Sequence, residues 1–113
     1  MTLIIISNPP SQDLEPLELL LALAAFEQAP KILLLGQGVH YANKFQQAKK
    51  TNGKSPSKVI SALPMYDCDE ILVRKDDLIE QGLEVTDLQD FYRLVDNHEI
   101  KQLINQSKHC VNF

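Results

Sequence analysis

The protein has 113 residues, of which 44% are hydrophobic, and a formal net charge of −4. This length predicts a single domain, residues 1–113, with one hydrophobic core, and the negative net charge disfavours nonspecific binding to nucleic acids. The longest unbroken apolar run, residues 19–26, is far shorter than the roughly 20 residues of a membrane-spanning helix. Since no basic region precedes the apolar residues 2–6, we expect no signal peptide and a soluble cytoplasmic protein.

Apolar runs typical of buried strands alternate with helical segments along the chain. The continuous apolar, β-branched residues 3–7 predict a strand that is covered on both faces, as in a parallel sheet. Further strands are predicted at 31–36, 70–74, 91–95 and 108–113, and helices at about 13–28, 39–50, 57–63 and 76–82. A last helix is predicted to start at Asp96 and to carry Ile100, Leu103 and Ile104 on one face. We therefore expect an α/β three-layer sandwich, in which a mostly parallel sheet of about five strands is flanked by helices.

Acidic residues mark the beginnings of two of these helices. Asp76 or Asp77 is a plausible N-cap for the short helix that ends at Gly82. Asp96, followed three residues later by Glu99, resembles a capping box at the start of the last helix.

The first predicted helix is apolar on two sides. Leu14, Leu17, Leu21 and Ala24 form one stripe, and the opposite side carries Leu19, Leu20, Leu23 and Phe26. A surface helix needs only one apolar stripe to cover its own sheet. We therefore expect the second side to lie against another subunit, so that these four residues form an oligomer interface.

Charge is unevenly distributed along the chain. Residues 28–66 contain six lysines and no acidic residue, whereas residues 67–99 contain eleven acids and three basic residues. Such asymmetry can provide complementary patches for assembly. The alternative for the basic stretch 49–58 is a solvated loop.

Polar residues follow the predicted strands at their carboxyl ends, where parallel sheets bind ligands. The residues expected on this ligand- or partner-facing edge are Asn8, His40, Arg74, Lys75 and His98. Arg74 and Lys75 could bind an anion or the acidic group of a partner. His40 and His98 could face one crevice as an acid–base pair or as metal ligands, the alternative being surface or interface hydrogen bonds. No spacing supplies a third metal ligand, so we expect neither a metal nor another cofactor.

The stretch "GQGVH" at 36–40 lacks the third glycine of a GxGxxG motif and is not a Walker loop. We interpret its two glycines as a tight turn from a strand to a helix.

The two cysteines show no CxxC spacing, which argues against a disulfide framework or a structural zinc site. Cys68 precedes the third strand and lies between Asp67 and Asp69, whose charges disfavour a thiolate. Cys110 falls inside the last strand, where a free cysteine is usually a small buried hydrophobic residue. Both are therefore expected to be structural or incidental, and the alternative is that one of them carries sulfur.

Several segments together resemble the DsrE/DsrF-like family of sulfur-relay proteins, and within it the TusC (DsrF-type) subunit. They are the Leu/Ala-rich helix, the "GQGVH" turn, "LPMYDCDEILV", "KDDLIEQGL" and the terminal "CVNF". The resemblance implies a parallel sheet flanked by helices and a hetero-oligomer with TusB-like and TusD-like subunits. It also implies the transfer of persulfide sulfur toward 2-thiouridine at the wobble base of tRNA, or related cytoplasmic sulfur trafficking, with tRNA contacted only indirectly.

In this family the sulfur-carrying cysteine belongs to the DsrE/TusD type of subunit and lies at the carboxyl end of the third strand. Arg74 holds that place here, within about one residue, and an arginine cannot carry a persulfide. The resemblance therefore implies a noncatalytic companion subunit. The alternatives are a stand-alone oligomer of the same fold that binds a small anion, or a persulfide carrier that uses Cys68 or Cys110.

Overall fold

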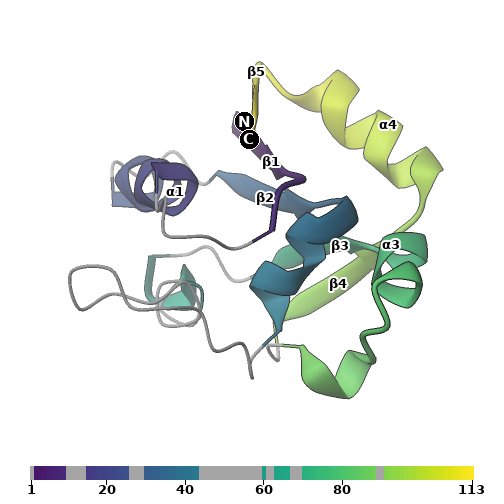
Figure 1. Ribbon diagram of the computed structural model, residues 1–113. Helices are drawn as coiled ribbons and strands as arrows, with labels where there is room; N and C mark the ends of the chain where they lie inside the picture. The colour runs from purple at the N-terminus through teal and green to yellow at the C-terminus, as the bar shows by residue number, and fades with distance from the viewer. Residues whose placement is uncertain are drawn as a thin grey trace.

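The computed structural model describes residues 2–9, 15–25, 30–43, 60, 63–66, 70–88 and 91–113 (Figure 1). The strands are β1 (Thr2–Ile6), β2 (Lys31–Leu34), β3 (Ile71–Arg74), β4 (Tyr92–Val95) and β5 (His109–Asn112). The α-helices are α1 (Glu15–Ala25), α3 (Lys75–Glu80) and α4 (Asn97–Gln106), and the 3-10 helices are η1 (Gly36–Ala42), η2 (Leu63–Tyr66) and η3 (Val85–Asp87).

The five strands form one parallel sheet in the order β4-β3-β2-β1-β5. In its register, Ile4 of β1 lies opposite Ile32 of β2 and Val111 of β5. All five predicted strands and their parallel arrangement are thereby confirmed. Helices α1, α3 and α4 follow β1, β3 and β4 in the chain, and such helical connections favour parallel strands. The apolar residues of β1, β2 and β3 suit strands that are buried on both faces.

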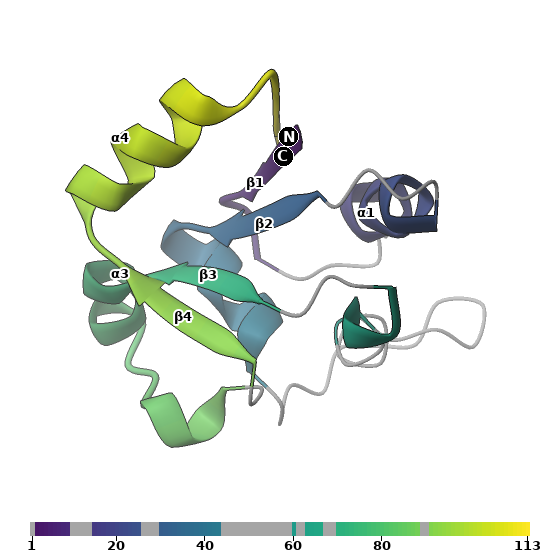
Figure 2. The same ribbon diagram turned by 180° about the vertical axis from the view of Figure 1, so that it is seen from behind.

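Each face of the sheet has its own hydrophobic cluster, because successive side chains of a strand point to opposite faces. On one face Ile4, Ile32 and Leu34 pack with residues of α1, η1 and α3. On the other face Leu3, Leu33 and Leu72 pack under Ile100 and Leu103 of α4. Figures 1 and 2 show α1 and α4 on opposite sides of the sheet. The molecule is thus the three-layer α/β sandwich that the sequence predicts.

The position of α1 corrects the prediction for one of its leucines. Leu20 is fully buried in the core of its own domain, so it cannot face a partner as expected. Leu19 and Leu23 are half-buried and pack against the same core. Among the α1 residues whose exposure the structure describes, Glu18, Ala22 and Ala25 are exposed and are spaced as one helical stripe. A helix with leucine on several sides does not reveal its rotation, which is why Leu20 was misplaced. Phe26 lies outside the described residues, as does Leu14.

Two helix starts differ from the prediction. Helix α3 begins at Lys75 with Arg74 in the N-cap position, so Asp76 and Asp77 lie in its first turn and do not cap it. The turn after β2 is a 3-10 helix that starts at Gly36, earlier than the helix predicted from residue 39. The remainder of that predicted helix, residues 44–50, and most of the predicted helix 57–63 fall outside the described part of the chain.

Of the two hydrogen bonds of the capping box predicted at the start of α4, one is formed. Asp96 Oδ1 accepts a hydrogen bond from the Glu99 N–H at 2.9 Å, as an N-cap does. The Glu99 carboxylate accepts instead from Arg93 Nη1, so it does not close the reciprocal half of the box. Arg93 also donates from Nε to Glu70 at 3.0 Å, and these contacts raise the pKa of the guanidinium, with the Glu70 hydrogen bond as the largest cause. The Arg93 side chain thereby joins α4 to β4 and to the start of β3.

Among the residues that the structure describes, no helix is long and apolar enough to cross a membrane.

Candidate functional site

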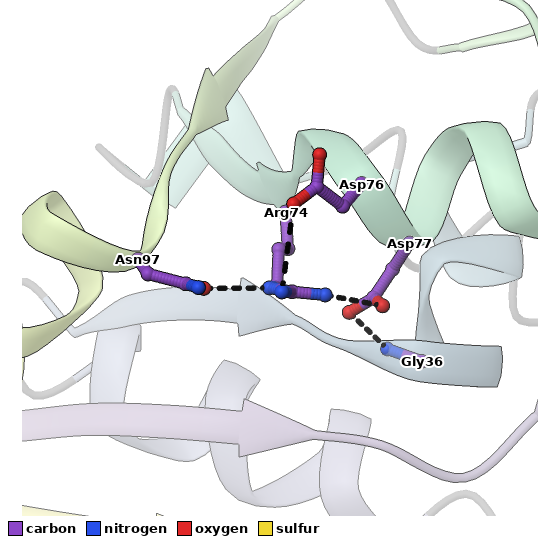
Figure 3. Close-up of polar contacts among 5 residues, drawn as sticks. All are labelled: Gly36, Arg74, Asp76, Asp77 and Asn97. Carbon is purple, nitrogen blue, oxygen red and sulfur yellow. Dashed lines mark hydrogen bonds and ion pairs between the residues drawn. The ribbon is translucent and has the colours of Figure 1, made fainter.

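A chain of hydrogen bonds links three loops at the carboxyl edge of the sheet (Figure 3). Arg74, the last residue of β3, donates from Nε to Asn97 Oδ1 at 2.8 Å and from Nη1 to Asp77 Oδ1 at 2.7 Å. Asp77 Oδ2 accepts in turn from the Gly36 N–H at 2.7 Å. The network therefore crosses the ends of β4, β3 and β2, which are neighbours in the sheet. The sequence-based expectation that these loops share one edge is correct for this group.

Asp77 is the residue of this site that sequence reasoning missed. Its side chain is 11% exposed, and both of its oxygens accept charge-assisted or backbone hydrogen bonds. The sequence signal was present, because an acid three residues after an arginine at a helix start can fold back onto it. Asp76 lies 3.6 Å from Arg74 Nη2 but is 75% exposed, so solvent screens this second ion pair.

The ion pair between Arg74 and Asp77 affects whether Arg74 can bind an anion, as the sequence suggested. The Arg74 side chain is 25% exposed, and its guanidinium already pairs with a carboxylate of its own chain. An incoming anion would have to compete with Asp77 for it. The other cation expected at this edge, Lys75, is exposed at the first position of α3. Asn8 follows β1 and is also exposed.

The two histidines of the predicted edge each pair with a glutamine. His40 Nε2 lies 3.1 Å from Gln81 Oε1, a contact that joins η1 to the end of α3. His98 Nε2 lies 3.4 Å from Gln102 Nε2 within the exposed surface of α4. The His98 contact is exposed, whereas the His40 contact is partly buried. Within the described ranges no three His, Cys, Asp or Glu side chains are grouped closely enough to hold a metal ion.

The second glycine of the "GQGVH" turn, Gly38, lies against the backbone of β1. A Cβ at Gly38 would lie 2.0 Å from the carbonyl oxygen of Ile6, a contact that no side chain can make. Gly36 has a φ of +52°, the left-handed conformation that glycine adopts without strain. Both glycines therefore serve the tight turn between β2 and η1, as the sequence indicates.

Cys110 is exposed, which contradicts the expectation that it is buried. It lies in β5, an edge strand whose residues are exposed apart from the half-buried Val111. Its register partner is Leu3, near the amino end of β1, so Cys110 is distant from the carboxyl edge that carries Arg74. The sequence did not reveal this, because the residues that predict a strand do not show whether it is central or at an edge of the sheet. Cys68 lies outside the described residues.

Comparisons with known proteins agree with this fold. The ychN protein from E. coli has a similar structure, with a TM-score of 0.84 and 17% sequence identity over 99% of this chain and 97% of that one. MTH1491, a protein of unknown function from Methanobacterium thermoautotrophicum, is similar with a TM-score of 0.69 and 14% identity over 99% and 96% of the two chains. A search of curated proteins finds no match.

At these identities the two structures show a shared fold and no more. The sequence model of the DsrE/DsrF-like family, however, matches residues 1–113. Together with the five-stranded parallel sheet and its flanking helices, this match over the full length establishes that the chain belongs to the DsrE/DsrF-like family.

Proposed function

We propose that the protein is a TusC/DsrF-like, noncatalytic subunit of a cytoplasmic sulfur-relay complex. In this proposal the complex passes persulfide sulfur toward 2-thiouridine synthesis at the wobble base of tRNA. The observation that carries the proposal is the identity and setting of Arg74 at the carboxyl end of β3. The resemblance described above places the sulfur-carrying cysteine of the DsrE/TusD type of subunit at that position.

The chemistry of the site supports an accessory role. A persulfide carrier needs a thiolate that attacks a sulfur donor and then holds the transferred sulfur. A guanidinium has no such nucleophile, and hydrogen bonds to Asp77 and Asn97 hold Arg74 in place. The exposed Cys110 lies toward the opposite end of the sheet. The carboxyl edge therefore suits contact with a partner better than covalent sulfur transfer.

Two surfaces are candidates for contact with TusB-like and TusD-like partners. The first is α1, where Leu19 and Leu23 remain half-buried and so retain apolar surface that a neighbouring subunit can cover. The second is the carboxyl edge, where Lys75 and His98 are exposed. The tRNA would meet only other parts of the complex.

Co-expression tests the assembly. The chain, tagged, is expected to purify in a stable complex with TusB-like and TusD-like subunits. Leu23→Glu is expected to weaken the complex, because it places a charge in an apolar contact, whereas the exposed control Ala22→Ser leaves it intact. Failure of the wild-type chain to purify with either partner would refute the proposed role.

Labelling with a persulfide donor separates an accessory subunit from a carrier. The chain alone is expected to take up no thiol-dependent label, and in the assembled complex the label is expected on the TusD-like partner. Label on the isolated chain that disappears in Cys68→Ser or Cys110→Ser would identify that cysteine as a carrier and overturn the accessory assignment.

A further inference from the structure

The outer edge of β5 carries backbone groups that the molecule itself leaves unpaired. Phe113 N–H donates to the Ile5 carbonyl at 2.8 Å, and the Phe113 carbonyl accepts from the Ser7 N–H at 3.0 Å. Because inward and outward groups alternate along a parallel strand, the N–H and C=O of Val111 also face β1. Those of Cys110 and Asn112 therefore point away from the sheet, and within the described chain they have no hydrogen-bond partner.

This edge lacks the features that usually protect an exposed strand from pairing. Such edges are commonly blunted by charged side chains, prolines or a covering element. None of the residues His109, Cys110, Val111 and Asn112 is an acid, a lysine, an arginine or a proline. In Figure 1 none of the described helices and strands runs along the outer side of β5. The opposite edge strand, β4, carries Arg93 with its two acidic partners.

We propose that β5 pairs antiparallel with β5 of a second copy of this chain, which extends the sheet across a two-fold axis. A second copy fits because an antiparallel edge is complementary to itself: one strand rotated by 180° offers a donor opposite each acceptor. This contact is distinct from the α1 surface and does not rest on the proposed role in sulfur relay.

The outward N–H and C=O groups of Cys110 and Asn112 determine how the two β5 strands align. Cys110 pairs with Asn112 of the second copy, and Asn112 with its Cys110, so that each pair exchanges two backbone hydrogen bonds. Val111 then lies opposite Val111 of the second copy in a pair without hydrogen bonds, with Cα atoms about 4.5 Å apart. The two Cys110 residues become diagonal neighbours, about 7–8 Å apart. A strand this short covers less than the roughly 800 Å² per partner of a standard interface, so the dimer should dissociate on dilution.

Proline substitutions test the edge with little effect on the domain itself. Sedimentation velocity over a concentration series is expected to show a monomer–dimer equilibrium for the wild type. Cys110→Pro removes an N–H that points outward, so the dimer dissociation constant should rise about tenfold or more while the thermal melting of the monomer changes little. Asn112→Pro should behave in the same way. Cys110→Ser keeps the N–H and should dimerise like the wild type, and Val111→Pro, which loses the inward bond to β1, should destabilise the fold.

Cross-linking tests the register. After mild oxidation, Val111→Cys in a Cys68→Ser, Cys110→Ser background is expected to form a disulfide-linked dimer, because the paired Cα atoms fall within the about 4.4–6.8 Å of a disulfide. Native Cys110 in a Cys68→Ser background should cross-link much less. Three outcomes would overturn the proposal: a wild-type chain that is monomeric at all concentrations, a Cys110→Pro chain that dimerises as well as the wild type, or cross-linking at Cys110 in place of Val111.

Discussion

Arg74 and Asp77 hold three loops together through two side chains that are three residues apart. Because Asp77 is nearly buried and serves both Arg74 and the Gly36 N–H, its removal leaves two donors without their acceptor. We predict that Asp77→Ala lowers the free energy of unfolding by about 1–3 kcal/mol. The exposed neighbour provides the control: Asp76→Ala should change it by less than about 0.5 kcal/mol. Urea unfolding measures both, and equal effects would contradict the structural role of Asp77.

Substitution of Gly38 or Gly82 by alanine should lower stability for different reasons: a steric clash at Gly38 and an unfavourable backbone conformation at Gly82. At Gly38 an added Cβ would meet the Ile6 backbone, which cannot move without distorting β1. We predict that Gly38→Ala costs about 3 kcal/mol of stability, at the upper end of overpacking penalties. Gly82 has a φ of +74° with nothing within 4 Å of an added Cβ, so Gly82→Ala should cost only the strain of about 1 kcal/mol. Denaturant unfolding measures the free energy of unfolding of both variants. A smaller loss of stability in Gly38→Ala than in Gly82→Ala would exclude the close approach of Gly38 to Ile6.

At the scale of elements, the rotation of α1 decides which leucines are fully buried in the domain and which keep part of their surface exposed. Leu20 is fully buried, so Leu20→Ala is expected to lower the free energy of unfolding by about 2–5 kcal/mol. Leu23 is half-buried, and Leu23→Ala should cost distinctly less in the isolated chain, because fewer apolar contacts are lost. Chemical denaturation of the two variants measures the loss in free energy of unfolding. A larger loss for Leu23→Ala than for Leu20→Ala would contradict the burial of Leu20 in the core.

At the scale of the whole molecule, acidic and basic residues are separated along the chain. The eleven acids of residues 67–99 include the exposed Asp76, Glu80 and Glu84. If this surface attracts basic partner surfaces in the proposed relay complex, added salt should weaken association, because the Debye length falls from about 10 Å at 0.1 M to about 3 Å at 1 M. Titration calorimetry at both salt concentrations measures the change. A dissociation constant that is independent of salt would assign the interface to apolar contacts alone.

Much of the fold was predictable because its signals are local. The strands are short apolar runs between breakers, and helical segments between successive strands favour parallel pairing, so the element types and the sheet follow from patterns of neighbouring residues. The site was only partly predictable. Because parallel sheets bind ligands at the carboxyl ends of their strands, the sequence correctly placed Arg74 at that edge. It did not identify Asp77, because the two acids after Lys75 cannot be distinguished from the sequence alone. The cap at Asp96 was predictable, whereas the use of the Glu99 carboxylate by Arg93 was not.

The sequence by itself determined the class of fold, the alternation of its elements and the absence of a thiol at the end of the third strand. These depend on residue type and spacing, which the chain carries directly. Only the tertiary structure decided that Leu20 faces the core, that Cys110 lies on an exposed edge and that Asp77 joins Arg74 to Gly36, 41 residues away from it in the chain. Rotation of a helix, the place of a strand in the sheet and a hydrogen bond between distant loops all depend on which segments pack together. The free energy of packing is shared among residues that are far apart in the chain, so no local pattern contains it.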